Sequence, residues 1–249
     1  MAKQSGLGDQ LFIGGYDLGA DIQQISSLST SRETLPATGI TQSANARIFG
    51  KRDAQAEFNA YFNPAANQAH SRLKLLPTAD THIMYLRGTT LGNEGLGMIG
   101  KQIDYSGSRG DDGSLMFGVQ VSSNGYGADW GRQLTAGKRS DATATNGSSV
   151  DLLTGSLSFG FQAYLQVFSF TGTSVTIKIQ ESSDNGGGDA FADITGGAFT
   201  TVTGITSERI QSSSATQTVE RYVRVVTTGT FSQCTFAVLF TRNDALRTL

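Results

Sequence analysis

The sequence has few of the residues on which secreted and catalytic proteins commonly depend. It holds one cysteine, so no disulfide can form within the chain, and two histidines, so the Cys/His pairs of a zinc site are missing. Charged residues make up 16% and the net charge is -2, which gives no basic surface for nucleic-acid binding. The surface is therefore expected to be neutral and polar, built from Ser, Thr, Asn, Gln and Gly.

Long apolar runs are also missing. No stretch is long enough to span a bilayer, and residues 1–8 lack the apolar segment of a secretion signal. We therefore expect a product that is made and folds in a cytoplasm. With 31 glycines and only three prolines among 249 residues, the composition indicates a mainly β chain with many turns.

The clearest pattern is a strand followed by a helix. One side of the strand over residues 53–62 is apolar: Ala54, Ala56, Phe58, Ala60 and Phe62. The other side is polar: Asp53, Gln55, Glu57, Asn59 and Tyr61. Asn63 then supplies a helix N-cap, Pro64 a first-turn residue, and Pro77 a stop, which predicts a short α-helix over about 64–76.

The remaining chain predicts two β domains. Residues 1–150 would form an N-terminal sandwich or barrel carrying the helix, with a long polar loop near 29–45. Residues 98–105 and 114–122 read as a hairpin, and 122–149 as a connection between domains. Residues 151–249 would form a C-terminal antiparallel β-sandwich, with strands over 161–170, 175–180, 219–227 and 235–241.

Several motifs have simpler explanations than function. Gly95–Gly100 matches G-x-G-x-x-G, but strand residues follow where a dinucleotide site needs a helix, so we reject it. Arg109-Gly110-Asp111 is an integrin-like tripeptide that we interpret as a hairpin turn. Cys234 shares an apolar strand face with Phe236, which predicts a buried, inert thiol.

Metal and catalytic sites find little support either. Asp184, Asp189 and Asp193 could converge on Ca²⁺, but the EF-hand spacing is absent and a solvated loop is the simpler interpretation. A Ser-His-Asp catalytic site would have to use His70 or His82, but the sequence contains no G-x-S-x-G elbow that would expose its serine. A glycosidase that uses two carboxylates distant in the sequence and close in space stays an open alternative. We expect no enzymatic activity, no metal and no cofactor.

A family resemblance spans nearly the whole chain. The order of residues 47–63, a helix and a strand resembles the major tail (tail tube) proteins of long-tailed bacteriophages, especially those of actinobacterial siphophages. Further stretches that resemble this family are Arg87–Gly92, Arg109–Leu115, Asn124–Gly127, Gln133–Gly137, Glu220–Arg224 and Thr241–Asn243.

The resemblance implies a virion protein of the phage tail, assembled in the host cytoplasm. Six copies would form a ring, and stacked rings would form a tube that DNA crosses without specific binding. The tube would meet tail-terminator and tail-tip proteins and enclose a tape-measure protein. Asp53, Gln55, Glu57 and Asn59 are then expected to face the lumen. Arg32, Glu33, Thr34 and Leu35 would contact the next ring, and 151–249 would decorate the tube or complete it.

Two alternatives remain. One is a carbohydrate- or receptor-binding virion protein that uses aromatic side chains of the second domain and its surroundings, for which the candidates are Trp130, Tyr164, Phe168 and Tyr222. The other is a head-decoration protein. The polar face of strand 53–62 also has a plain explanation, since it could be the solvated side of any sheet.

Overall fold

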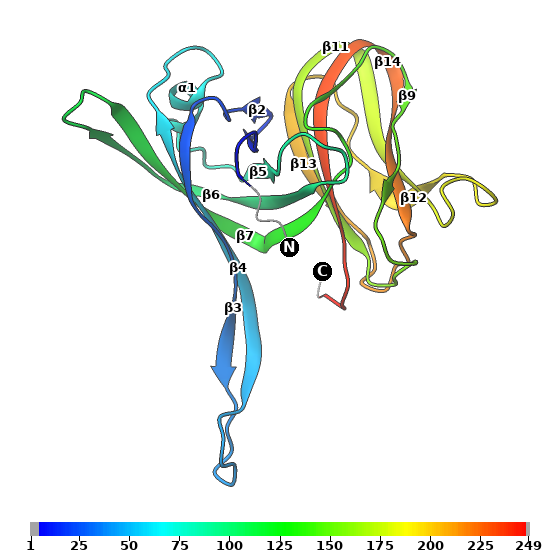
Figure 1. Cartoon of the computed structure of the whole chain (residues 1–249), viewed down its shortest axis with the longest axis horizontal. Coiled ribbons are helices and arrows are strands. Elements are labelled where there is room, and N and C mark those ends of the chain that lie inside the picture. The colour runs from blue at the N-terminus through cyan, green and yellow to red at the C-terminus, as the bar shows by residue number, and fades with distance from the viewer. Residues whose placement is uncertain (1–4, 248–249) are drawn as a thin grey trace. The chain divides into compact units, whose positions relative to one another are not determined.

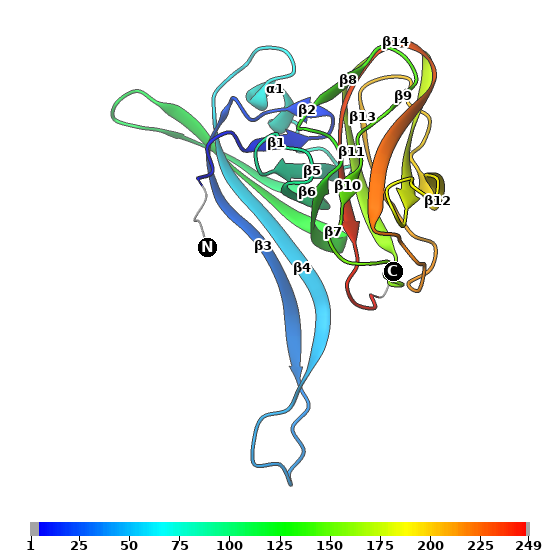
Figure 2. The same ribbon diagram turned by 45° about the vertical axis from the view of Figure 1, so that its right-hand side comes forward.

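The structure, a computed structural model, describes residues 5–247 and is mainly β (Figures 1 and 2). The predicted fold class is confirmed. Within residues 5–247, all strand pairings are antiparallel and belong to one extended sheet, and there is one very short α-helix. None of the helical segments described is long and apolar enough to cross a membrane.

The elements, in chain order, are β1 (Gln10–Ile13), β2 (Tyr16–Asp17), β3 (Ile22–Pro36), β4 (Arg47–Tyr61), α1 (Ala69–Leu73), β5 (Thr81–Leu86), β6 (Glu94–Arg109), β7 (Leu115–Gln133), β8 (Arg139–Asp141), β9 (Thr145–Asn146), β10 (Val150–Asp151), β11 (Phe161–Ser182), β12 (Ala192–Ala198), β13 (Thr206–Gln211) and β14 (Tyr222–Arg242).

The chain divides into two compact units, each built from separate segments. Unit 1 comprises 1–20, 82–97 and 129–249; unit 2 comprises 21–81 and 98–128. These units differ from the expected division into 1–150 and 151–249. The reason is pairing between distant segments, because β8, β9 and β10 all lie along β14 and thereby join residues 139–151 to the C-terminal part.

In unit 1, β11 and β14 pair along almost their entire lengths, from Phe161↔Arg242 to Ser182↔Tyr222. The prediction that each would be two strands is wrong. The segment between the two strands expected over 161–170 and 175–180 is instead a bulge, where the register shifts on both sides of Gly172. Gly172 has a φ of 151°, and a Cβ there would overlap the backbone of Phe231, so only glycine fits.

The outer edges of β11 and β14 are also paired. β13 pairs with the first half of β11 and β12 with the second half. β14 pairs in turn with β10, β9, β8 and the end of β7. The interpretation of 122–149 as a domain connection is therefore wrong. Its short strands lack hydrophobic periodicity because they are only two or three residues long.

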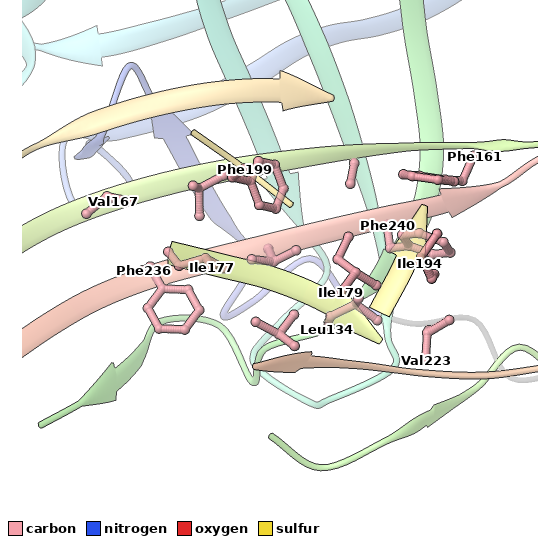
Figure 3. Close-up of a cluster of buried hydrophobic side chains, with 14 of the residues drawn as sticks. Leu134, Phe161, Val167, Ile177, Ile179, Ile194, Phe199, Val223, Phe236 and Phe240 are labelled. Carbon is pink, nitrogen blue, oxygen red and sulfur yellow. The ribbon is translucent and has the colours of Figure 1, made fainter. Parts of the chain in front are cut away.

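The core of unit 1 is a cluster of buried aliphatic and aromatic side chains that includes Phe161, Ile177, Ile179, Phe199, Phe236 and Phe240 (Figure 3). Phe161 and Phe240 stack with ring centroids 5.3 Å apart. Cys234 belongs to the same cluster and is fully buried, and burial raises the pKa of its thiol to about 12. The predicted burial of Cys234 is confirmed, and the raised pKa disfavours the reactive thiolate.

In unit 2, β3 and β4 form a long hairpin whose connection is residues 37–46 (Figure 1). The predicted loop over 29–45 is therefore too long, since residues 29–36 belong to β3. The sequence did not predict residues 29–36 as strand, because residues 30–36 are all exposed and show no alternating apolar face, and the register shifts between Arg32 and Thr34. β7 pairs with the other edge of β4.

The helix of unit 2 is much shorter than the predicted 64–76. Asn67 has a φ of 65°, which no α-helix accepts, so α1 starts only at Ala69. The backbone N–H of Ala69 donates to Asp21 Oδ2 at 2.9 Å, and Asn63 Nδ2 donates to Asp21 Oδ1 at 2.8 Å. Asn63 does not cap the helix; it accepts from the N–H of Ala65 at 3.2 Å within a turn.

Candidate functional site

The structure brings the four predicted lumen residues together on one face of β4. Asp53, Gln55, Glu57 and Asn59 alternate with the buried side chains of Ala54, Ala56, Phe58 and Ala60. The period of two in the sequence therefore holds through the middle of the strand. Asp53 is exposed, while the other three are half-buried by their neighbours.

The strands on both sides extend this polar face. Paired residues of an antiparallel sheet share a face. Gln120 Nε2 donates to Glu57 Oε1 at 3.2 Å, and Ser123 Oγ donates to Asp53 Oδ1 at 3.0 Å. The residues of β3 and β7 that pair with these four are Gln24, Ser27, Ser29, Ser31, Gly118, Gln120 and Ser122. The face thus has two carboxylates and no Lys or Arg among these positions.

The opposite face of β4 is closed by apolar packing. Val119 and Val121 of β7 pair with Phe58 and Ala56, and all four are buried. Ala69 and Leu73 of α1 are buried as well, and α1 contacts β4. One face is thus fixed as the interior of unit 2, and the polar face is left for solvent or a partner.

The predicted ring-contact residues lie in β3, not in a loop. Arg32 pairs with Arg52, Thr34 with Phe49 and Leu35 with Ile48, in the half of the hairpin that extends away from the rest of unit 2 (Figure 2). The guanidinium of Arg32 lies 5.2 Å from the centre of the Phe49 ring.

This distal half of the hairpin, residues 31–52, exposes several large apolar side chains. The exposed fractions are 40% for Leu35, 106% for Ile40, 57% for Ile48 and 74% for Phe49. A two-stranded ribbon without a core is marginally stable in water, and exposed apolar residues gathered at one place indicate an interaction surface. Sequence reasoning missed Ile40, Ile48 and Phe49, although the adjacent Ile-Phe pair was a visible signal.

The glycine-rich motif has a packing role. Gly95, Gly97 and Gly100 all lie in β6, so strand follows them, as expected, in place of the helix that a dinucleotide site needs. A Cβ on Gly97 would overlap the ring of Tyr164, and one on Gly95 would lie 2.7 Å from the carbonyl oxygen of Tyr85. The glycines are needed because neighbouring groups occupy the space of a side chain.

The expected turn around Arg109–Asp111 is also present. β6 ends at Arg109, and the N–H of Gly110 donates to the carbonyl of Ser114 at 2.8 Å. Asp112 Oδ1 accepts from the N–H of Ser114 at 2.9 Å, which holds the pKa of Asp112 below its usual range. The tripeptide belongs to the β6–β7 hairpin turn.

Hydrogen bonds and an ion pair already engage the carboxylates in and after the acidic loop that follows β11. Asp184 accepts backbone N–H groups from Gly188, from Asp189 at 3.2 Å and from Gly187 at 2.9 Å, and these bonds lower its pKa. Asp193 pairs with Lys178 at 2.7 Å. No group of three or more His, Cys, Asp or Glu side chains within residues 5–247 is arranged to hold a metal ion.

The two histidines lie in different surroundings. His70 Nδ1 lies 2.8 Å from the hydroxyl of Tyr105, and its ring packs beside Phe62 and Phe117. His82 Nδ1 lies 3.1 Å from Ser207 Oγ, and Ser207 belongs to the regular strand β13 instead of a strand-to-helix turn.

The four aromatic candidates for sugar binding have different environments. Tyr164 is fully buried, and its hydroxyl donates to Asp129 Oδ2 at 2.8 Å; burial raises the pKa of Tyr164. Phe168 packs edge-on against Phe12 at 4.7 Å, and Tyr222 is half-buried. Trp130 is 46% exposed and is the candidate that remains accessible.

Comparisons with known proteins give weak likenesses only. No protein-family model and no curated protein matches the sequence. Among solved structures, the chain is similar to one from the tail of an empty gene transfer agent particle refined with C6 symmetry. The identity is 14%, the TM-score is 0.40, and the match covers 50% of this chain and 97% of that one.

Two further likenesses cover most of this chain. The Dit protein of phage SPP1, described as a hub of the adsorption apparatus, has 13% identity and a TM-score of 0.33 over 93% of this chain and 98% of its own. A chain of the phage p2 baseplate has 10% identity and a TM-score of 0.32 over 95% and 99%. At such TM-scores these likenesses assign neither a fold family nor an activity.

Proposed function

We propose that this protein is a structural subunit of a phage-type tail, in which copies of the chain join into stacked rings around a channel. The family resemblance of the sequence suggests the assembly, with six copies a ring. The observation that carries the proposal is the polar face of β4, which gathers Asp53, Gln55, Glu57 and Asn59 on one side of a sheet whose other side is packed.

The chemistry of this face suits passage of DNA. A protein surface holds DNA by neutralising phosphates with Lys or Arg and releasing their counterions. The rows that include Gln55 and Glu57 offer amides, hydroxyls and carboxylates without a cation. A channel lined in this way would repel phosphates weakly and bind none of them tightly.

The distal hairpin supplies a contact between copies. Leu35, Ile40, Ile48 and Phe49 expose apolar area on a ribbon that lacks a core of its own. Burying them against another copy would remove this area from water, at roughly 25 cal/mol for each Å². We therefore assign Arg32, Glu33, Thr34 and Leu35, together with these apolar residues, to the contact between successive rings.

Electron microscopy of the purified protein tests the assembly. We expect rings or hollow tubes at high concentration, or after addition of tail-tip seeds. Ile48→Asp combined with Phe49→Asp should abolish stacking while leaving the melting temperature unchanged. Leu75→Asp, which alters an equally exposed residue outside the hairpin, is the matched control. Compact monomers under all these conditions would refute the proposal.

The lining of the channel is tested separately by charge. Gln55→Lys combined with Asn59→Lys should leave ring formation intact and create DNA binding that weakens steeply between about 50 and 200 mM salt. The same substitutions at Ser207 and Glu208, which lie in β13 of unit 1, serve as a comparison. Equal DNA binding by both variants would show that the polar face of β4 does not line the channel.

A further inference from the structure

Unit 1 contains an open cavity of about 390 Å³ that the assembly role leaves without a use. Its walls come from four separate parts of the chain: β6, the end of β7, the segment after β10 and the end of β14. The lining residues with functional side chains are Glu94, Trp130, Arg132, Thr154, Arg242 and Asp244. The volume falls within the usual range for small-molecule sites.

An accessible aromatic ring forms one wall. Trp130 is the only tryptophan of the chain and is 46% exposed. The ring of Tyr85 meets it edge-on at 6.4 Å, and Thr241 Oγ1 donates to the backbone carbonyl of Trp130 at 3.1 Å. The indole is thus held in place on one side and open on the other, as a stacking platform requires.

A second wall is fixed by Arg242. Its guanidinium donates to the carbonyls of Gly155 at 3.0 Å, Glu220 at 3.1 Å and Thr154 at 3.2 Å. These bonds fasten the segment after β10 beside the end of β14. The donors of Arg242 are largely used by the protein itself, so this residue shapes the cavity and leaves ligand recognition to others.

Unused acceptors lie in the same cavity. Within residues 5–247, the carboxylates of Glu94 and Asp244 take part in no hydrogen bond or ion pair. Arg132 lies near them in the lining and donates to the carbonyl of Gly92 at 3.3 Å, which leaves further N–H groups. The cavity therefore offers two carboxylate acceptors and one guanidinium group with several N–H donors, all beside an aromatic ring.

We propose that this cavity binds a neutral saccharide, with one sugar ring stacked on Trp130 and its hydroxyls bonded to Glu94, Asp244 and Arg132. Carboxylates accept O–H donors and a guanidinium donates to hydroxyl oxygens, so a polyhydroxylated ligand satisfies both. The charges of the lining, two carboxylates and two guanidinium groups, cancel and favour an uncharged ligand. The site requires no partner copy and stands independently of ring formation.

The fluorescence of Trp130 reports on the site directly, because no other tryptophan contributes. The full-length protein is titrated with a panel of neutral oligosaccharides (maltotriose, cellotriose, chitotriose and mannotriose), with glucuronate and with choline chloride. We expect a saturable change with at least one neutral saccharide. Glu94→Gln and Asp244→Asn should each weaken binding about tenfold, equivalent to about 1.4 kcal/mol.

Trp130→Ala removes the reporter, so it is measured by calorimetry, where it should abolish the binding heat. Tyr126→Ala alters an exposed aromatic residue that lies outside the cavity, in unit 2, and should leave binding unchanged. Binding of choline or glucuronate alone would overturn the proposal, because either would show that charge selects the ligand. Absence of any change across the panel would overturn it as well.

Discussion

Gly97 illustrates how a single residue of this protein is dictated by its surroundings. The ring of Tyr164 fills the space that a side chain at position 97 would need, and Tyr164 is itself fixed by its hydrogen bond to Asp129. The ring cannot move aside without breaking a buried polar contact. A sequence motif that resembles a nucleotide-binding signature is thus explained by packing.

We predict that Gly97→Ala destabilises the protein by about 1–3 kcal/mol, because the added methyl group overpacks the interior. Gly204→Ala is the matched control, since nothing lies within 4 Å of the methyl group there, and it should change stability by less than about 0.5 kcal/mol. Urea unfolding measures both. Equal stability of the two variants would contradict the packing role of Gly97.

The ion pair between Asp151 and Arg221 should contribute to stability in a defined pH range. Arg221 donates to the two carboxylate oxygens of Asp151 at 2.8 and 2.7 Å, which lowers the pKa of Asp151 to about 2. Because the pKa of the folded state is depressed, the contribution is present above about pH 4 and is lost as the pH falls toward 2.

Urea unfolding of the wild-type protein and of Asp151→Asn over this pH range measures the contribution. The wild-type protein should be the more stable one at pH 6, and the difference should vanish near pH 2. Arg221→Gln should show the same pH dependence. A difference that stays constant with pH would mean that Asp151 acts through packing instead of charge.

At the scale of elements, regular segments were predictable and irregular ones were not. The alternation gave residues 53–60 of β4 their correct two faces, because β4 pairs with β7 in unbroken register from Gln55 to Tyr61. Phe62, which was expected on the apolar face, lies beyond the end of β4 and is 39% exposed. Residues 29–36 of β3 were taken for a loop, since residues 30–36 are all exposed and give no alternating apolar face. The helix was overextended because the conformation of Asn67 is decided by its surroundings, not by its propensity.

The distal hairpin should be the first part of the free subunit to be cut by trypsin. Arg47 begins β4 next to the exposed connection 37–46 and is itself exposed. Few buried contacts hold this segment, so it opens locally at little cost. We expect cleavage after Arg47 in the monomer and protection in assembled tubes, as followed by mass spectrometry. Equal cleavage rates in both states would exclude the hairpin from the contact.

At the scale of the whole molecule, the division into units follows pairings that link distant residues. Leu134 and Val150 belong to the core of β11 and β14, and Phe12 packs with Tyr164 and Leu239. Such partners are up to hundreds of residues apart in the sequence, so no local sequence pattern predicts their contact. The same holds for the cavity of unit 1, where Trp130 was a candidate but Glu94, Arg132 and Asp244 were not.

We therefore predict that a fragment of residues 151–249 does not fold alone, although a sandwich was expected there. The fragment lacks β8, β9 and Val150 of the two-residue strand β10, which would leave the outer edge of β14 unpaired. Circular dichroism should show no cooperative thermal transition, whereas the full chain should unfold cooperatively. A folded fragment with a sharp transition would show that these strands are dispensable.

The loop after β11 has a practical consequence. Ser182 is fully buried and donates to the carbonyl of Asp189 at 2.7 Å while accepting the N–H of Gly186 at 2.8 Å, so the base of the loop is clamped. Residues 183–188 beyond that clamp are all exposed. A foreign epitope spliced in after Gly187 would leave the framework untouched. A filament made of such subunits would repeat the epitope at every copy, which is the geometry that antigen-display particles require.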